Sequence, residues 1–129
     1  MRDRYDALDA RTKQFAIQVI LLVKDIESLP VIRWLGRQLV DAATSVAANQ
    51  RAARRARSDR ELAAKLSIIV EEADETAFWC ELLDALPLPA ALKPRLRELI
   101  LEAEELRAIF AKGRATVRER LRISKTKTE

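Results

Sequence analysis

Apolar residues recur every three or four positions along four stretches of this chain, and charged residues fill most positions between them. This period places the apolar side chains of each stretch on one face of an α-helix. We expect helices at about residues 10–28, 32–57, 59–86 and 90–122, and a frayed polar tail at 123–129. Amphipathic helices with short connections are typical of an antiparallel up-down-up-down four-helix bundle. The pattern therefore predicts an all-α fold in one domain spanning residues 1–129.

Prolines and a capping signal mark the boundaries of these helices. Pro30 ends the first helix, because the residue before a proline is driven out of the helical region. Ser58 and Glu61 form a capping box, in which each side chain satisfies a free backbone N–H at the start of the third helix. Pro87 and Pro89 separate the third helix from the fourth. Such interruptions argue against one extended coiled coil.

The first helix is apolar around more of its circumference than a bundle core requires. Phe15, Val19 and Leu22 align on one face, and Ile17 and Ile20 widen that face. Exposed apolar surface on this scale normally marks an interface, so we expect another subunit to cover it. Further aromatic residues exceed what a four-helix core readily holds, namely Trp34, Phe78 and Trp79.

Small residues dominate the core side of the second helix, so a neighbouring helix can approach it closely. Gly36 lies within this pattern and costs about 1 kcal/mol relative to alanine in a helix. We interpret it as a mark of close packing.

The composition excludes several classes of function. The 129 residues include no histidine and a single cysteine, Cys80, which excludes zinc sites and nucleophiles activated by histidine. Carboxylates are the catalytic groups that this composition leaves for an enzyme, which disfavours catalysis, and we expect no metal, no cofactor and no catalytic activity. No apolar run reaches the ~18 residues of a membrane span, and one cysteine cannot form an internal disulfide. These observations predict a cytoplasmic protein without a membrane partner.

The net charge of +4 is distributed unevenly. Residues 51–60 contain five arginines and one acidic residue, whereas residues 111–129 contain seven basic and two acidic residues. Both segments fall at the same end of an up-down bundle, and clustered arginines bind phosphates. The candidate nucleic-acid-binding residues are Arg51, Arg54, Arg55, Arg57, Arg60, Lys112, Arg114 and Arg118. A solvated helix end is the alternative, and the absence of aromatic residues among the arginines argues against base stacking.

Polar residues beside the core are candidates for contacts between the second and third helices. Ser45 and Asn49 lie one turn apart, and we expect them to be half-buried and hydrogen-bonded to Glu72 or Glu75. The carboxylates at 71–75 suit either ion pairs with arginines of the second helix or a metal site. Because no Glu-x-x-His arrangement exists here, ion pairs within or between subunits are favoured.

The order of polar and apolar residues in the middle of the chain resembles a known bacterial family. The residues that carry the resemblance are Gln38, Leu39, 44–49, Arg51, 54–58, Lys65, Leu66, Ile68, Ile69, 71–76, Trp79 and 81–83. Residues 11–16 and 104–110 are similar as well, so the resemblance covers residues 8–118. The family consists of four-helix-bundle proteins encoded in intervening sequences of 23S ribosomal RNA genes.

This resemblance implies a left-handed up-down bundle that assembles into a ring, typically a homopentamer, without enzymatic activity. It also implies kinship with the accessory proteins of diversity-generating retroelements, which partner a reverse transcriptase and bind nucleic acid through a basic surface. Gln50 replaces a usual tyrosine, Ala52 a usual acidic residue and Ser67 a usual glycine. The change at Ala52 raises the positive potential beside the arginines. We therefore expect an oligomeric accessory protein that binds RNA or DNA, with a protein-binding scaffold ring as the alternative.

Overall fold

The computed structural model describes residues 2–26 and 29–128, and every regular element in these residues is helical. The long α-helices are α1 (Arg2–Lys24), α2 (Pro30–Arg54), α3 (Asp59–Asp84) and α4 (Lys93–Thr128), and a short 3-10 helix, η1 (Ala90–Leu92), precedes α4. The described residues contain no strand, which confirms the all-α prediction. None of the helices in these residues combines the length and the apolar character needed to cross a membrane.

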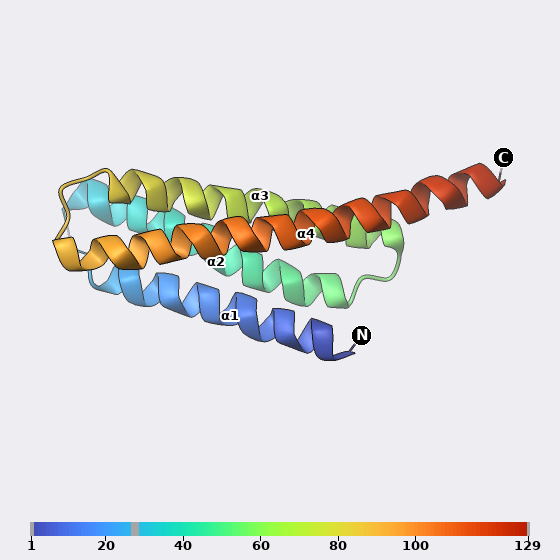
Figure 1. The fold of residues 1–129 in the computed structure, drawn as a ribbon, viewed down its shortest axis with the longest axis horizontal. Coiled ribbons are helices and arrows are strands. Elements are labelled where there is room, and N and C mark those ends of the chain that lie inside the picture. The colour runs from blue at the N-terminus through green and yellow to red at the C-terminus, as the bar shows by residue number, and fades with distance from the viewer. Residues whose placement is uncertain (1, 27–28, 129) are drawn as a thin grey trace.

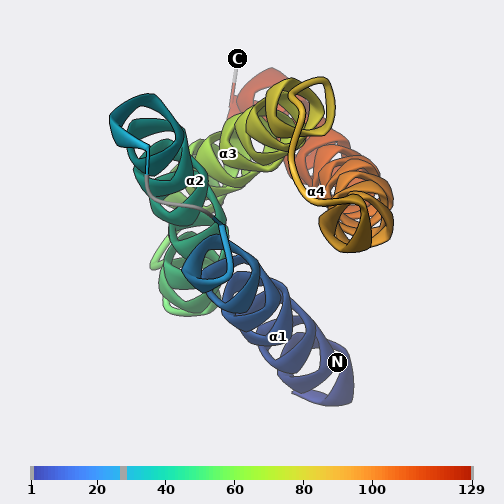
Figure 2. The ribbon, with the colours of Figure 1, turned by 90° about the vertical axis from the view of Figure 1, so that its left-hand side faces the viewer.

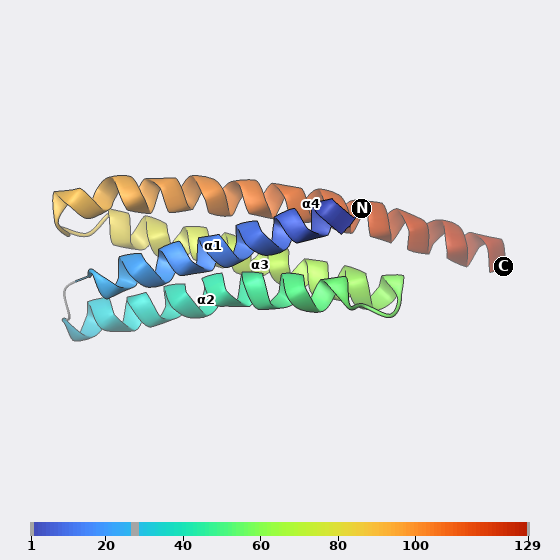
Figure 3. The same ribbon diagram turned by 90° about the horizontal axis from the view of Figure 1, so that it is seen from below.

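The helices lie side by side along the long axis of the molecule, and each runs opposite to the helix before it in the chain (Figure 1). Viewed along that axis, α2 and α3 form the middle of an arch whose two arms are α1 and α4 (Figure 2). The last turns of α4 project beyond the turn between α2 and α3 (Figure 3). One end of the molecule therefore gathers the start of α1, the α2–α3 turn and the C-terminal turns of α4.

Local sequence sets the limits of α2 and α3. Leu29 is extended, with φ −70° and ψ 144°, and Pro30 then occupies the first turn of α2, where no N–H is needed. Ser58 Oγ accepts a hydrogen bond from the Glu61 backbone N–H at 3.1 Å and so caps α3. This half of the predicted capping box is confirmed. The Glu61 carboxylate instead lies 3.8 Å from the Arg57 guanidinium.

The N-terminal helix begins earlier than the apolar pattern indicates. It starts at Arg2 rather than near residue 10, because Asp6 and Asp9 in its first turns form ion pairs with Arg54 on α2. It ends at Lys24, and the predicted end at Ser28 lies outside the described residues. α2 and α3 end at residues 54 and 84, slightly before the predicted 57 and 86.

The C-terminal helix is longer than predicted. We expected a helix at 90–122 and a frayed tail at 123–129, whereas η1 and α4 together form helix as far as Thr128. Bonds between neighbouring turns stabilise this polar extension. Arg122 binds Glu119 with N–O distances of 3.0 and 2.6 Å, and the Thr126 hydroxyl donates to the Arg122 carbonyl at 2.9 Å.

The core consists of the apolar faces that the sequence pattern predicts. The largest fully buried apolar side chains are Val19, Leu22, Leu39, Val46, Ile69, Leu83, Leu96 and Leu106. Gly36 marks a close approach of α1 to α2, as predicted, because a Cβ atom there would lie 2.9 Å from Val23 Cγ1. Cys80 is buried in the core, and this burial raises the pKa of its thiol to about 12, so the thiol stays protonated.

Several large apolar side chains lie outside this core. Ile17, Ile20 and Leu21 on α1 are each more than two-fifths exposed, at 41%, 44% and 43%. Trp34 on α2 and Phe78 on α3 are 47% and 48% exposed. The wide apolar face of α1 therefore points away from the other helices of its own subunit.

Candidate functional site

The basic end of the molecule contains a groove of about 570 Å³ between α1 and α2. It is lined by Asp9, Lys13, Ala47, Arg51, Arg54 and Arg55. Three arginines and one lysine face a single carboxylate, so the groove is electropositive. Three of the predicted binding residues therefore converge on one cavity, and Lys13 joins them from the neighbouring helix.

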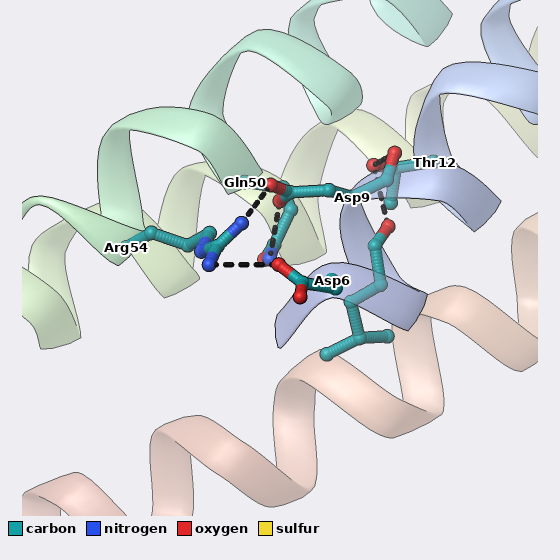
Figure 4. Close-up of polar contacts among 6 residues, drawn as sticks. Asp6, Asp9, Thr12, Gln50 and Arg54 are labelled. Carbon is teal, nitrogen blue, oxygen red and sulfur yellow. Dashed lines mark hydrogen bonds and ion pairs between the residues drawn. The ribbon is translucent and has the colours of Figure 1, made fainter. Parts of the chain in front are cut away.

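One of these arginines is engaged by the first turns of α1, as Figure 4 shows. The Arg54 guanidinium binds the Asp9 carboxylate and lies 3.0 Å from Asp6 Oδ1. Gln50 donates to Asp9 Oδ1 at 3.1 Å, and the Arg54 guanidinium carbon lies 5.8 Å from the centre of the Tyr5 ring. Arg54 therefore attaches the start of α1 to the end of α2, which corrects the expectation that it belongs to an open phosphate-binding surface.

The electrostatics of this contact are favourable on both sides. The hydrogen bond to Asp9 raises the pKa of Arg54 above its usual value. Partial burial alone would raise the pKa of Asp9, but hydrogen bonds from Arg54 and Gln50 outweigh it and the pKa of Asp9 is lowered. Both groups are therefore charged at neutral pH, and Arg54 is shared between the carboxylates of Asp9 and Asp6.

The other arginines of the groove are available to a ligand. Arg51 and Arg55 are exposed, and neither forms an ion pair with any carboxylate in the described ranges 2–26 and 29–128. A guanidinium carries five N–H donors in a planar fork that matches phosphate geometry. Arg51 and Arg55 therefore present unused donors at the mouth of the groove.

The α2–α3 turn and α4 carry the remaining predicted residues. Arg57 has a 90% exposed side chain, and Arg60 and Lys112 are exposed, whereas Arg114 is half-buried. Arg118 reaches back to α3, where its Nη2 lies 3.4 Å from Ser67 Oγ. Arg120 and Asp59 form a two-bond ion pair of 3.0 and 3.2 Å, which attaches α4 to the start of α3 at this same end.

The predicted contact between Asn49 and the carboxylates of α3 is wrong. Asn49 and Ser45 are half-buried, as expected, but Asn49 Nδ2 donates to the Ser45 carbonyl at 2.9 Å and to its hydroxyl at 3.0 Å, both on α2. Glu75 accepts a hydrogen bond from Trp79 Nε1 at 3.1 Å, one turn along α3. The helical period correctly indicates which face Asn49 shares, but the acceptors of its amide N–H groups are on its own helix, at Ser45.

Among the described residues of one subunit, the acidic stretch at 71–75 forms no ion pair with the arginines of α2. Its ion pair is formed by Asp74 with Arg107 on α4, at 3.9 Å. Partial burial raises the pKa of Glu72, and the neighbouring charges of Glu75, Glu71 and Asp41 raise it further. Within the described residues, no group of three or more His, Cys, Asp or Glu side chains is arranged to hold a metal ion.

Five residues of the site were not predicted from the sequence pattern, namely Tyr5, Asp6, Asp9, Lys13 and Gln50. Asp6, Asp9 and Lys13 fall at helical spacing, which is a usable signal once the helix is extended to Arg2. Gln50 is 3% exposed and donates a hydrogen bond to Asp9.

The fold is similar to that of a solved protein. That protein has unknown function and comes from the S23 ribosomal protein family of Bacteroides thetaiotaomicron VPI-5482. The match has a TM-score of 0.70 and 23% sequence identity, and it covers 81% of this chain and 95% of that chain. At this identity the likeness shows a shared fold. No family model matches the chain, and no curated protein matches it.

Proposed function

We propose that this protein is a non-enzymatic, homo-oligomeric accessory protein that binds RNA or DNA through its basic end. In this proposal it is a cytoplasmic up-down-up-down bundle of the family encoded in intervening sequences of 23S ribosomal RNA genes. The fold shared with a member of the S23 ribosomal protein family supports this assignment. The observation that carries the binding function is the groove of about 570 Å³ in which Lys13, Arg51 and Arg55 converge.

Phosphate is the ligand chemistry that suits this groove. Its lining holds four cations, Lys13, Arg51, Arg54 and Arg55, against the carboxylate of Asp9, and Asp6 lies beside Arg54 as a second carboxylate, so positive charge is in excess at the groove. Cations in that arrangement displace the counterions of a nucleic acid and bind its phosphate oxygens. The α2–α3 turn region adds Arg57 and Arg60 to the positive surface, and the second half of α4 adds Lys112, Arg114 and Arg118. Such contacts are made to the phosphate backbone of the nucleic acid and not to its bases, so the preference for particular base sequences should be weak.

Assembly is the second part of the proposal. The exposed side chains of Ile17, Ile20, Leu21, Trp34 and Phe78 support assembly, because large exposed apolar patches mark protein interfaces. The family resemblance implies five subunits in a ring. A ring would also repeat the basic end several times, so a polyanion would bind several weak sites at once.

A binding assay across a salt series tests the nucleic-acid function. Fluorescence anisotropy with labelled single- and double-stranded RNA and DNA should give affinities that fall steeply with salt. Each neutralised phosphate contributes about 0.7–0.9 to the log–log slope. Arg51→Ala/Arg55→Ala should weaken binding and flatten the slope. The matched control is Arg97→Ala/Arg107→Ala, which removes two exposed arginines of α4 outside the basic end and should leave the slope unchanged.

A protein-binding scaffold is the second candidate function. The exposed aromatic surface of Trp34 and Phe78 favours it, because aromatic residues are enriched at protein interfaces. A reverse transcriptase is the partner class that the family resemblance implies. Undetectable binding of all four oligonucleotides at physiological salt would contradict the nucleic-acid function and favour this scaffold.

A further inference from the structure

Three cations surround the groove between α1 and α2 from both of its walls. Arg51 and Arg55 lie one turn apart on α2, and Lys13 lines the same groove from α1. Ala47 lies one turn before Arg51 and also lines the groove, so no large side chain fills that part of the α2 wall. The groove therefore has room for a compact anion between cations that belong to two helices.

The two arginines have no compensating carboxylate on their own helix. The residues three and four positions from Arg51 along α2 are Ala47, Ala48, Arg54 and Arg55. Like charges one turn apart on a helix are unfavourable. The carboxylates at the groove both come from α1, where Asp9 lines it and Asp6 lies beside Arg54. Four cations and two carboxylates leave a net charge of +2, which an anion between Arg51 and Arg55 would neutralise.

A terminal phosphate has the charge and the number of oxygens that suit this groove. An internal phosphate of a nucleic acid is a diester with one negative charge and two free oxygens. A terminal phosphate is a monoester, which carries a charge of about −1.5 to −2 at pH 7 and three acceptor oxygens. Two guanidinium groups and one ammonium group can donate to all three oxygens at once. The convergence of Arg51, Arg55 and Lys13 therefore matches a terminal phosphate better than an internal one.

We propose that this groove binds the terminal phosphate of a nucleic-acid strand as a monoester dianion. The inference rests on the proposed nucleic-acid function and specifies which phosphate enters the groove. Arg51 and Arg55 donate N–H groups to the terminal oxygens, and Lys13 supplies a third positive charge from α1. The dianion carries the charge of two internal phosphates, so its release has a correspondingly large effect on the salt dependence of binding. The exposed Arg57 and Arg60 at the α2–α3 turn contact internal phosphates of the same strand.

Arg54 is a positioning residue of this groove. Its guanidinium binds Asp9 and lies 3.0 Å from Asp6 Oδ1, so it fixes the start of α1 against the end of α2. Lys13 follows Asp9 by one helical turn, and the same contact therefore sets the distance between Lys13 and Arg51 across the groove.

Strands that differ in their ends alone test this site. Three single-stranded oligonucleotides of one sequence carry a 5′-phosphate, a 3′-phosphate or no terminal phosphate, and an internal fluorophore leaves both ends accessible. Anisotropy at physiological salt should show roughly tenfold tighter binding of one phosphorylated strand, and the preferred strand identifies which end enters the groove. Arg51→Ala/Arg55→Ala should bind all three strands equally. Arg51→Lys/Arg55→Lys keeps the charge without the planar forks, so it should retain most of the salt slope and lose most of the preference. The control Arg97→Ala/Arg107→Ala should keep the full preference.

A pair of mononucleotides tests the charge of the ligand on the unaltered protein. Adenosine monophosphate is a monoester dianion, whereas cyclic adenosine monophosphate has the same base and sugar but is a diester monoanion. The first should displace the phosphorylated strand at a roughly tenfold lower concentration than the second. This difference should disappear between about pH 7.5 and 5.5, because the second pKa of a phosphate monoester is about 6. The chain has no histidine, so the loss in this range reports the ligand.

The outcomes separate this inference from the proposed function. Equal affinity for the three strands would overturn the terminal-phosphate site and leave nucleic-acid binding standing. A preference that persisted in Arg51→Ala/Arg55→Ala would also overturn it, because the terminal phosphate would then bind elsewhere. Equal displacement by the two mononucleotides at pH 7.5 would overturn it without any variant, even where circular dichroism shows a variant to be unfolded. The absence of binding to any strand at physiological salt would overturn both the site and the proposed function.

Discussion

The Arg11 side chain on α1 binds both carboxylate oxygens of Glu102 on α4, with its Nε 2.8 Å from one oxygen and its Nη2 2.6 Å from the other. This ion pair bridges the two arms of the arch, beside a groove of about 300 Å³ that Phe15 and Leu99 help to line. The carboxylate raises the pKa of Arg11 above its usual value, and Glu105 adds a second contact at 3.3 Å. The Arg11–Glu102 ion pair thus holds α1 close to α4.

A double-mutant cycle should measure this bridge. Because the two side chains are 34% and 30% exposed, we expect Arg11→Ala and Glu102→Ala to show a coupling free energy of about 1 kcal/mol in urea unfolding. The Arg107–Asp74 pair, whose single contact is 3.9 Å, is the comparison and should couple by less than about 0.5 kcal/mol. Equal coupling for the two pairs would mean that the two-bond geometry of Arg11 adds nothing to stability.

The two glycines should respond in opposite ways to alanine. Alanine favours a helix interior by about 1 kcal/mol over glycine when space permits. At Gly113 the nearest side-chain atom to a new Cβ, Leu66 Cδ1, is 4.0 Å away, so Gly113→Ala should raise the free energy of unfolding by about 0.5–1 kcal/mol. At Gly36 the new Cβ would lie 2.9 Å from Val23 Cγ1, and the stiff valine side chain cannot easily move aside. Gly36→Ala should therefore destabilise the subunit by about 1–3 kcal/mol. A stabilising Gly36→Ala would contradict the close packing of α1 on α2.

The apolar pattern predicted the four helices and their buried faces because burial repeats with the helical period. The first turns of α1 were not predicted, because the apolar pattern is weak there. They contain few apolar residues, and their position depends on Arg54, which lies 45 residues beyond Asp9 in the chain. The partner of Asn49 was equally hidden, since its own helix offered an acceptor at 2.9 Å. Spacing indicates which face a polar side chain shares, whereas its partner depends on side-chain conformations and helix separations.

The pH dependence of stability should have two opposing parts. Partial burial, followed by three neighbouring carboxylates, raises the pKa of Glu72, so the folded subunit binds this proton more tightly than the unfolded chain does. Protonation of Glu72 should therefore increase the free energy of unfolding as the pH falls from 7 towards its usual value of 4.5. Asp9 and Asp59 have lowered pKa values, so the stability they contribute is present above the usual 3.8 and is lost below it.

Thermal unfolding followed by circular dichroism, at protein concentrations too low for assembly, checks both parts. The midpoint should rise slightly between pH 7 and about 4.5 and then fall below about 3.8. Glu72→Gln removes the titrating group and should raise the midpoint at pH 7 while flattening the rise. A profile that Glu72→Gln leaves unchanged would show that this carboxyl does not titrate at a raised pKa.

The three arginines of the groove should have two different roles. Arg54 should stabilise the fold, whereas Arg51 and Arg55 should bind phosphate. Arg54 is held by Asp6 and Asp9, so Arg54→Ala should loosen the first turns of α1 and lower the unfolding midpoint. Arg51 and Arg55 form no ion pair with the described residues, so Arg51→Ala/Arg55→Ala should leave that midpoint unchanged. The same double variant should reduce the salt slope of oligonucleotide binding by about 1.4–1.8, the contribution of two phosphates. Amide hydrogen exchange at residues 4–10 should increase in Arg54→Ala alone. If all three arginines changed stability alike and none changed the slope, the groove would be a structural contact rather than a phosphate site.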